Sequence, residues 1–213
     1  MLLGVVSEKN LRSARKAKGA GHLRRGEILQ AADAIFVREG YHGATIRRIA
    51  REVGLSSTAL YMHFRDKSEI LAAICESAMA HLIVQNDELA GLPLDPVTRV
   101  RRMMEAYIQW GLANPNTYQL VFANPPGTLS DVKLAGLSAL SAKSYEPFAE
   151  AMRAVAASGG LRGDVATSVD LCWTSTHGLI SLLITQPHYR WSDTPEGLQR
   201  ALLDALFDGL LAH

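Results

Sequence analysis

Two very short apolar segments that meet at Gly54 constrain the fold of this chain more than any other feature. Over residues 45–53 apolar side chains recur at the spacing of one helical face, and Gly54 ends that helix after two turns. Ser56 then caps a second short helix in which Leu60 points inward. Helices of this length are unstable alone, so a tight turn must hold one across the other, with Ala50 small at the crossing. The pattern predicts a helix-turn-helix.

Helical patterning continues on both sides of this motif, without sustained strand-like alternation. A preceding helix is expected over residues 23–39, with Gly40 as its left-handed cap. Asp66 and Glu69 form a capping box that opens a helix reaching about Leu89. Five further helices are expected after residue 90, separated by proline and glycine turns. The sequence therefore predicts an all-α protein of about nine helices.

The charges divide the chain in two, although the net charge is only +1. Residues 1–68 hold 13 Lys and Arg against 6 Asp and Glu, and the remainder holds 9 against 15. A basic first third next to an acidic remainder favours a polyanion, such as double-stranded DNA, as the partner of the first part.

The outward face of the short helix after Gly54 carries Ser57, Thr58 and Tyr61. Small hydroxyl side chains allow a helix to enter the major groove, while a tyrosine reaches the sugar-phosphate backbone. His63 and Lys67 flank this face and are candidates for phosphate contact. Arg47, in the first turn of the preceding helix, is a further phosphate candidate, whereas Arg48 could equally be a solvated side chain.

The run from Thr45 to Leu71, TIRRIAREVGLSSTALYMHFRDKSEIL, resembles the DNA-binding domain of the TetR (tetracycline-repressor-like) transcriptional regulators. The resemblance implies a homodimer whose C-terminal helices form a small-molecule pocket and the dimer interface. It places at DNA-contacting positions Thr45, Ser56, Ser57, Thr58, Tyr61, His63 and Lys67. Base preference does not carry over, because Ser57 and Thr58 occupy positions that vary with the operator.

We expect three parts: a flexible basic arm over residues 1–22, a helix-turn-helix domain over 23–68, and a helical effector-binding and dimerisation domain over 69–213. An ordinary flexible tail explains the first part as well as a DNA-binding arm does. The start of the chain does not have the pattern of a secretory signal, and no apolar run approaches about 20 residues. We therefore expect a cytoplasmic protein without a membrane partner.

The last two expected helices are apolar on more than one face, for example at Leu179, Leu182 and Leu183 in one and Leu202, Leu206 and Phe207 in the other. A peripheral helix needs only one apolar stripe. The excess predicts a homodimer through these two helices; burial within a monomeric core is the alternative.

Aromatic and methionine side chains suggest an apolar pocket in the second domain. The candidate ligand-binding residues are Met103, Tyr107, Trp110, Phe122, Trp173 and His177. Core packing explains each of them equally well. The pattern Trp173-x3-His177-Gly178 resembles a motif of a TetR subgroup, and a hydrogen-bonded core imidazole is the foremost interpretation of His177.

The chain holds no Gly-rich phosphate loop, Cys–His pair or carboxylate-rich motif that specifies an enzyme. Cys75 and Cys172 lack metal-ligand spacing, so we predict no catalytic residues, no metal site and no cofactor. The expected function is a DNA-binding transcriptional regulator, a repressor released from a palindromic operator by a small, largely apolar ligand of unknown identity. The alternative is a DNA-binding dimer, architectural or constitutive, without an effector.

Overall fold

The computed structural model describes residues 20–122 and 129–212. Within these ranges the chain forms nine helices, joined by turns and loops, and a single isolated β-bridge pairs Leu161 with Leu211. The helices are α1 (Ala20–Gly43), α2 (Ile46–Glu52), α3 (Ser57–Tyr61), α4 (Lys67–Ala90), α5 (Pro96–Ala113), α6 (Pro115–Phe122), α7 (Asp131–Ala157), α8 (Val165–Thr185) and α9 (Pro195–Leu210). The all-α expectation is confirmed. The predicted basic arm lies almost entirely outside the described residues and stays a prediction.

The helix ends follow the capping residues that the sequence predicts. Side-chain oxygens of Thr45, Ser56 and Asp66 accept hydrogen bonds from backbone N–H groups in the first turns of α2, α3 and α4. Each such cap stabilises its helix by about 1 kcal/mol. The capping box is modified, because Glu69 accepts from the backbone N–H of Arg65, at 2.7 Å, rather than from that of Asp66.

Two glycines with positive φ shape the N-terminal region. Gly54 has φ +66° and makes the turn between α2 and α3. Gly40 has φ +71° and ψ 157°, so it breaks the regular course of α1. Its φ is positive as predicted, but its ψ lies outside the left-handed helical region. One helical turn nevertheless continues to Gly43 beyond this kink, where the sequence predicts a helix end at Glu39.

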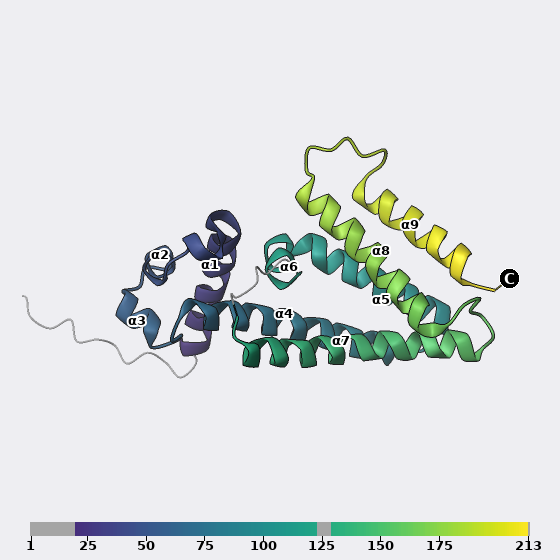
Figure 1. Cartoon of the computed structure of the whole chain (residues 1–213), viewed down its shortest axis with the longest axis horizontal. Helices are drawn as coiled ribbons and strands as arrows, with labels where there is room; N and C mark the ends of the chain where they lie inside the picture. Colours follow the sequence, from purple (N-terminus) through teal and green to yellow (C-terminus); the bar gives the residue numbers. More distant parts are fainter. Residues whose placement is uncertain (1–19, 123–128, 213) are drawn as a thin grey trace, which may run out of the picture.

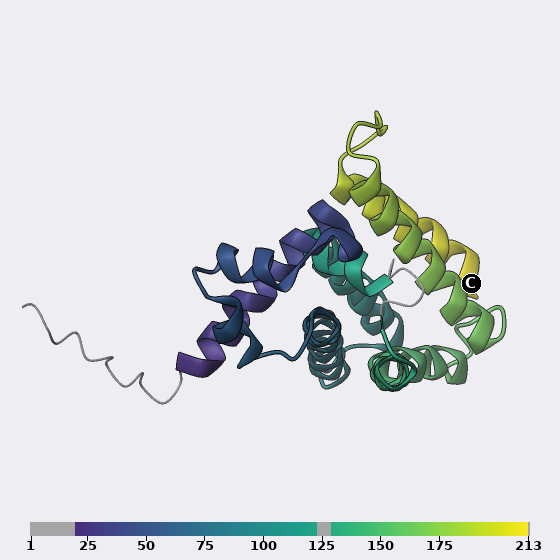
Figure 2. The same cartoon turned by 60° about the vertical axis from the view of Figure 1, so that its left-hand side comes forward.

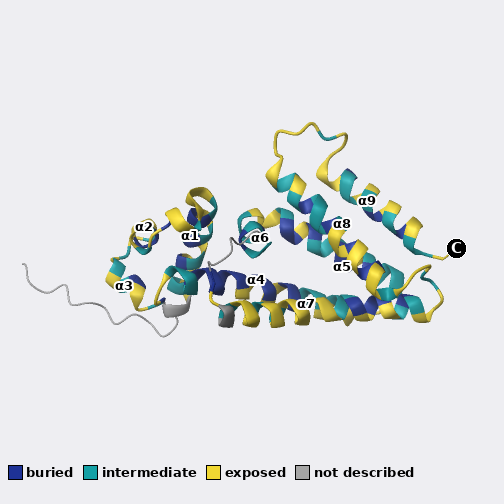
Figure 3. Ribbon diagram, viewed as in Figure 1, coloured by how far each residue is buried: buried dark blue, intermediate teal, exposed yellow. Residues whose placement is uncertain are grey.

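The long helix α4 is the central element of the fold. It packs against α1, α5, α6 and most extensively α7, and in Figure 3 it is largely dark blue while α7 keeps an exposed outer face. By length and composition alone α4 could cross a membrane, with a mean hydropathy of 1.2. However, neighbouring helices bury 56% of that window, and the core helix of a folded domain passes the same test.

The two ends of the molecule are built differently. Helices α1 to α3 form a small lobe at one end of α4, whereas α8 and α9 lie at the other side of the molecule, next to α5 and α7 (Figure 1). Figure 2 shows α4 and α7 side by side, nearly end on. Two buried clusters correspond to this division, one centred on α1 to α4 and one on α4, α5, α7, α8 and α9.

Candidate DNA-binding face and ligand cavity

The short helix α3 turns its predicted reading face to solvent. Leu60 is fully buried and anchors the helix, while Thr58 is exposed and Tyr61 and Met62 are 54% and 83% exposed. Ser57 is half-buried. A helix five residues long with one buried anchor keeps its remaining faces free for a partner.

The predicted hydroxyl contacts at the helix starts are already used in part. The Thr45 Oγ1 accepts from the Arg48 N–H at 3.1 Å, and the Ser56 Oγ accepts from the Ala59 N–H at 3.1 Å. Because each hydroxyl accepts through a lone pair, its proton remains able to donate to a phosphate oxygen. Capping and phosphate contact are therefore compatible at both residues.

Arg47 and Arg48 have different environments. The guanidinium of Arg48 forms ion pairs with Glu39, at 3.3 Å, and with Glu52. Arg47 is exposed and pairs with no acidic side chain of the described residues. The geometry thus favours Arg47 over Arg48 as the free cation beside α3.

The ammonium group of Lys67 forms hydrogen bonds within the DNA-binding lobe. Its Nζ donates to the backbone carbonyls of Tyr41, His42 and Ala44, at 2.7, 3.3 and 3.1 Å, and lies 4.5 Å from the Tyr41 ring centroid. All three ammonium protons are used, so the geometry favours a positioning role that holds the corner between α1 and α2. The predicted phosphate contact of Lys67 remains untested. His63 is half-buried beside the same lobe, with its backbone carbonyl accepting from Arg25 at 3.0 Å.

The second domain contains a cavity of about 470 Å³ between α4, α5, α7 and α8, with α6 at its edge. This volume lies in the usual range for small-molecule sites. Four of the six predicted ligand residues line it: Met103, Tyr107, Phe122 and Trp173. The structure thus brings together predicted side chains from three helices, α5, α6 and α8, that the sequence could only place separately.

Trp110 and His177 do not line this cavity. Trp110 is buried and faces a different hollow, between α1 and the start of α6, and it stacks with Tyr107 at 6.4 Å between ring centroids. The geometry therefore does not support the predicted direct contact of Trp110 and His177 with a ligand in this cavity. Apolar side chains spread around most of the circumference of α5, so its sequence does not indicate which of them turn toward the cavity.

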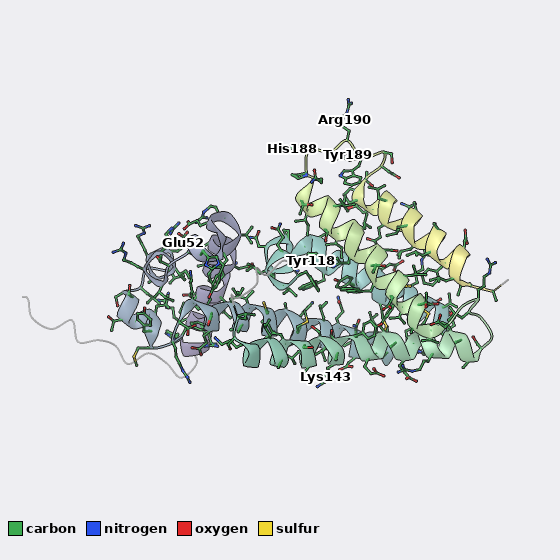
Figure 4. All side chains as sticks on the ribbon, in the orientation of Figure 1. Glu52, Tyr118, Lys143, His188, Tyr189 and Arg190 are labelled. Carbon is green, nitrogen blue, oxygen red and sulfur yellow. The ribbon has the colours of Figure 1, made fainter. Side chains whose placement is uncertain are left out.

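His177 belongs to an aromatic cluster just behind the cavity wall. Its Nδ1 lies 2.5 Å from the hydroxyl of Tyr118, which is labelled in Figure 4, and its ring packs against Phe122 and Trp173. Burial lowers the pKa of His177 below its ordinary value, because the charged form loses hydration. This is the hydrogen-bonded imidazole of the foremost interpretation. Gly178 is not needed for close packing within the chain, since a Cβ there would meet no atom within 4 Å.

The polar side of the cavity was missed by sequence reasoning. It comes from α7, whose Ser138, Ser141 and Tyr145 recur at helical spacing, together with Asn86 of α4 and Asp170 of α8. The signal was available as a stripe of serines at every third position, 138, 141 and 144, on an otherwise alanine-rich helix. Serines are common on solvated faces, so spacing alone could not distinguish the two cases.

One polar atom in the wall stands out. The hydroxyl of Tyr107 is buried beside the side chains of Tyr118 and Trp173, but neither forms a hydrogen bond of good geometry with it, and no other described residue does. Burial strongly raises the pKa of this hydroxyl, so it is a neutral donor. Buried polar groups are nearly always satisfied, and the cavity beside it is where a partner would fit.

The described residues contain no group of three or more His, Cys, Asp or Glu side chains suited to a metal ion. The one thiol in the cavity wall is that of Cys172, and burial raises its pKa to about 12. A thiol that stays protonated is a poor nucleophile.

These features define a helix-turn-helix protein whose exposed reading helix is attached, through α4, to a helical domain with its own cavity. A family profile described as "Bacterial regulatory proteins, tetR family" matches residues 28–74, and one described as "Tetracyclin repressor-like, C-terminal domain" matches residues 100–206. The second match alone spans half of the chain. The chain therefore belongs to the TetR family, whose members are transcription regulators rather than enzymes.

Individual relatives agree with this assignment. The HTH-type transcriptional activator FasR of Mycolicibacterium smegmatis is 32% identical over 116 residues, which is 53% of this chain and 53% of FasR. The chain thus aligns with about half the length of that curated relative. The crystal structure of PfmR from Thermus thermophilus is 26% identical, with a TM-score of 0.74 over 85% of this chain and 97% of PfmR. AibR, solved with isovaleryl coenzyme A and operator DNA, has a TM-score of 0.72 at 22% identity over 86% of this chain and 98% of AibR.

Proposed function

We propose that this protein is a homodimeric, ligand-responsive DNA-binding regulator that represses by occupying a palindromic operator and leaves it when a small, largely apolar molecule fills the cavity. The observation that carries the proposal is the pairing of an exposed, hydroxyl-rich α3 with a cavity in the same chain, joined by the continuous helix α4. Such a role belongs in the bacterial cytoplasm, where the DNA is.

The DNA contacts are assigned to α3 and its surroundings. Thr58 and Ser57 meet base edges, Tyr61 and His63 meet the backbone, and Arg47 pairs with a phosphate. We assign repression because it requires only that the protein occupy the DNA. Activation, the role that the name of FasR gives to that protein, requires a further partner.

The dimer is assigned to α8 and α9. Along one face of α8 runs a stripe of exposed or half-buried residues at helical spacing: Leu171, Thr174, Gly178, Leu182 and Thr185. Two are large apolar side chains, Leu171 at 45% and Leu182 at 49% exposed. Small exposed residues of α9, Ala201, Ala205 and Gly209, continue the surface. An apolar stripe with space above Gly178 suits close packing against a second copy.

Ligand control is assigned to the cavity. The AibR complex, which contains an acyl coenzyme A and operator DNA, supports effector control of DNA binding in this fold. Trp173 and His177 carry the Trp-x3-His-Gly motif of a TetR subgroup. Trp173 lines the cavity, and the ring of His177 packs against Trp173 from behind. A ligand can shift the protein only by its difference in affinity for the DNA-bound and free arrangements, so DNA must weaken ligand binding by the same factor. The effector-free alternative would show no such reciprocity.

The test begins with selection of genomic fragments by the purified protein, followed by affinity measurements on the selected duplex and a scrambled one. Tyr61→Phe should weaken both about equally, because backbone contacts position the helix without reading bases. Thr58→Val should instead change the ranking of operator variants, since a lost base contact is worth about 1–3 kcal/mol. The absence of any enriched sequence, or a Thr58→Val ranking identical to that of the unmodified protein, would contradict base reading by α3.

A further inference from the structure

The charge of the cavity wall restricts what the cavity can hold. Among the described residues that line it, the single ionisable carboxylate is Asp170, and the wall contains no Lys, Arg or His. Lys143, although it lies between the lining residues Ala142 and Ser144 in the sequence, sits on the outer side of α7 (Figure 4). An anionic ligand would therefore meet a negative charge without a compensating cation, and burying an unpaired charge is costly.

Asp170 is available to a ligand. It is exposed, and no described Lys, Arg or His lies within ion-pairing distance of its carboxylate. Trp173 stands one helical turn further along α8, and Tyr145 of α7 completes this part of the wall; the two residues are 44% and 37% exposed. A carboxylate near partly exposed aromatic side chains is a combination that attracts organic cations.

An apolar part of the wall lies between this region and Tyr107. Met79, Leu82, Met103, Met104 and Phe148 provide surface for a hydrocarbon body. The hydroxyls of Ser141, Ser144 and Thr176 already donate to protein atoms, which leaves the Tyr107 hydroxyl as the buried group in need of an acceptor.

We propose that the cavity binds a lipophilic cation, an amine or quaternary ammonium whose charged end lies beside Asp170 and whose apolar body extends toward Tyr107. An oxygen acceptor at the far end of the ligand would pair with the Tyr107 hydroxyl. This inference rests on the proposed function in one respect: both proposals take this cavity to be the effector site. It separates this chain from AibR, which was solved with a coenzyme A thioester, because the phosphates of that group would find no cation in this wall.

Three probes of equal chain length test the charge preference: octyltrimethylammonium, octan-1-ol and octanoate, each titrated calorimetrically below its micelle concentration. The expected order of affinity is the cation first, the alcohol second and the carboxylate last. Asp170→Asn should weaken the cation by about fivefold or more while leaving the alcohol within about twofold. Asp208→Asn, which removes an exposed carboxylate from α9, is the matched control and should change none of the three.

Location is tested by Ala142→Phe, whose ring would fill the cavity and should abolish binding of all three probes. Octanoate binding as tightly as the cation, or an unchanged preference in Asp170→Asn, would overturn the proposal, as would binding of none of the probes. The proposed regulatory function fails separately: if the cation binds in an Asp170-dependent manner and the selected duplex stays bound at saturation, the ligand class stands and release from DNA by that class does not.

Discussion

At the scale of single residues, Arg47 and Lys67 show how one charge type serves two purposes. Both are cations next to the reading helix, and the sequence predicts phosphate contact for both. In the structure Arg47 is exposed, while Lys67 donates to three backbone carbonyls. A sequence pattern gives the position of a charge but not its partners, which here come from Tyr41 to Ala44, more than 20 positions earlier.

This contrast predicts opposite phenotypes. Arg47→Met should leave the thermal unfolding of the protein unchanged, weaken selected and scrambled DNA alike, and lower the salt slope of binding by about one ion. Lys67→Met should destabilise the protein by about 1 kcal/mol or more, because the partly buried carbonyls of Tyr41 and Ala44 lose their donor. Unfolding in urea and DNA titrations at several salt concentrations measure both. Equal stability of the Lys67 variant and the unmodified protein would refute the positioning role.

His177 predicts a dependence of stability on pH. Burial lowers its pKa in the folded protein, so its contribution is fully present above the unfolded value of about 6.5 and is lost as the pH falls through the folded value. His177→Gln, which cannot titrate, should therefore lose less stability than the unmodified protein between about pH 6.5 and pH 5. Parallel loss in both proteins, measured by urea unfolding across this range, would show that His177 is not the titrating group.

At the scale of elements, α6 connects the cavity to the DNA-binding lobe. Phe122 lines the cavity, Tyr118 bonds to His177, and the hydroxyl of Thr117 donates to the carboxylate of Asp33 in α1 at 3.0 Å. The other carboxylate oxygen of Asp33 is buried without a partner among the described residues, and desolvation raises the pKa of this group. The link joins residues 84 positions apart. Local sequence patterns identify α4 as a strut but carry no signal for this second connection.

Thr117→Val tests the connection with almost no change of shape. We expect a loss of about 1 kcal/mol in stability, because Asp33 keeps its buried charge and loses its donor, together with a smaller effect of ligand on DNA affinity. Ser158→Ala at the end of α7 is the control, since that hydroxyl bonds only to the carbonyl of Val155 in the preceding turn. If both variants keep the full ligand effect, α4 alone carries the coupling.

Most of the secondary structure could be predicted from the sequence because its signals are local. Thr45, Ser56, Asp66, Asp95 and Asp164 cap the helices through bonds to residues three positions ahead. The cavity could be predicted only in part. Its apolar members are aromatic and methionine residues that stand out by type, whereas Asp170 and the serines of α7 become site residues only when four helices pack around them.

At the scale of the whole molecule, reading the two half-sites of a palindromic operator requires two copies of the chain. A single α3 offers a short reading surface, and a dimer places two recognition helices about 34–36 Å apart, in successive major grooves. Helices α8 and α9 lie at the opposite side of the molecule from α3 (Figure 1), so a dimer formed there leaves both reading helices free. Leu206 packs against the domain's own core, which makes Leu182, 49% exposed on α8, the better residue with which to probe the interface.

Sedimentation of the unmodified protein, Leu182→Arg and Leu134→Arg, each alone and with the selected duplex, tests the central claim most directly. Leu134 is 47% exposed on α7 and controls for adding a charge at an exposed leucine. We expect the unmodified protein and Leu134→Arg to be dimers that bind one duplex per two chains. For Leu182→Arg we expect folded monomers with at least about tenfold weaker DNA binding, because an unpaired charge buried in each copy is costly. A Leu182→Arg protein that remains dimeric and binds the duplex with unchanged affinity, or one chain per duplex in the unmodified protein, would contradict this claim.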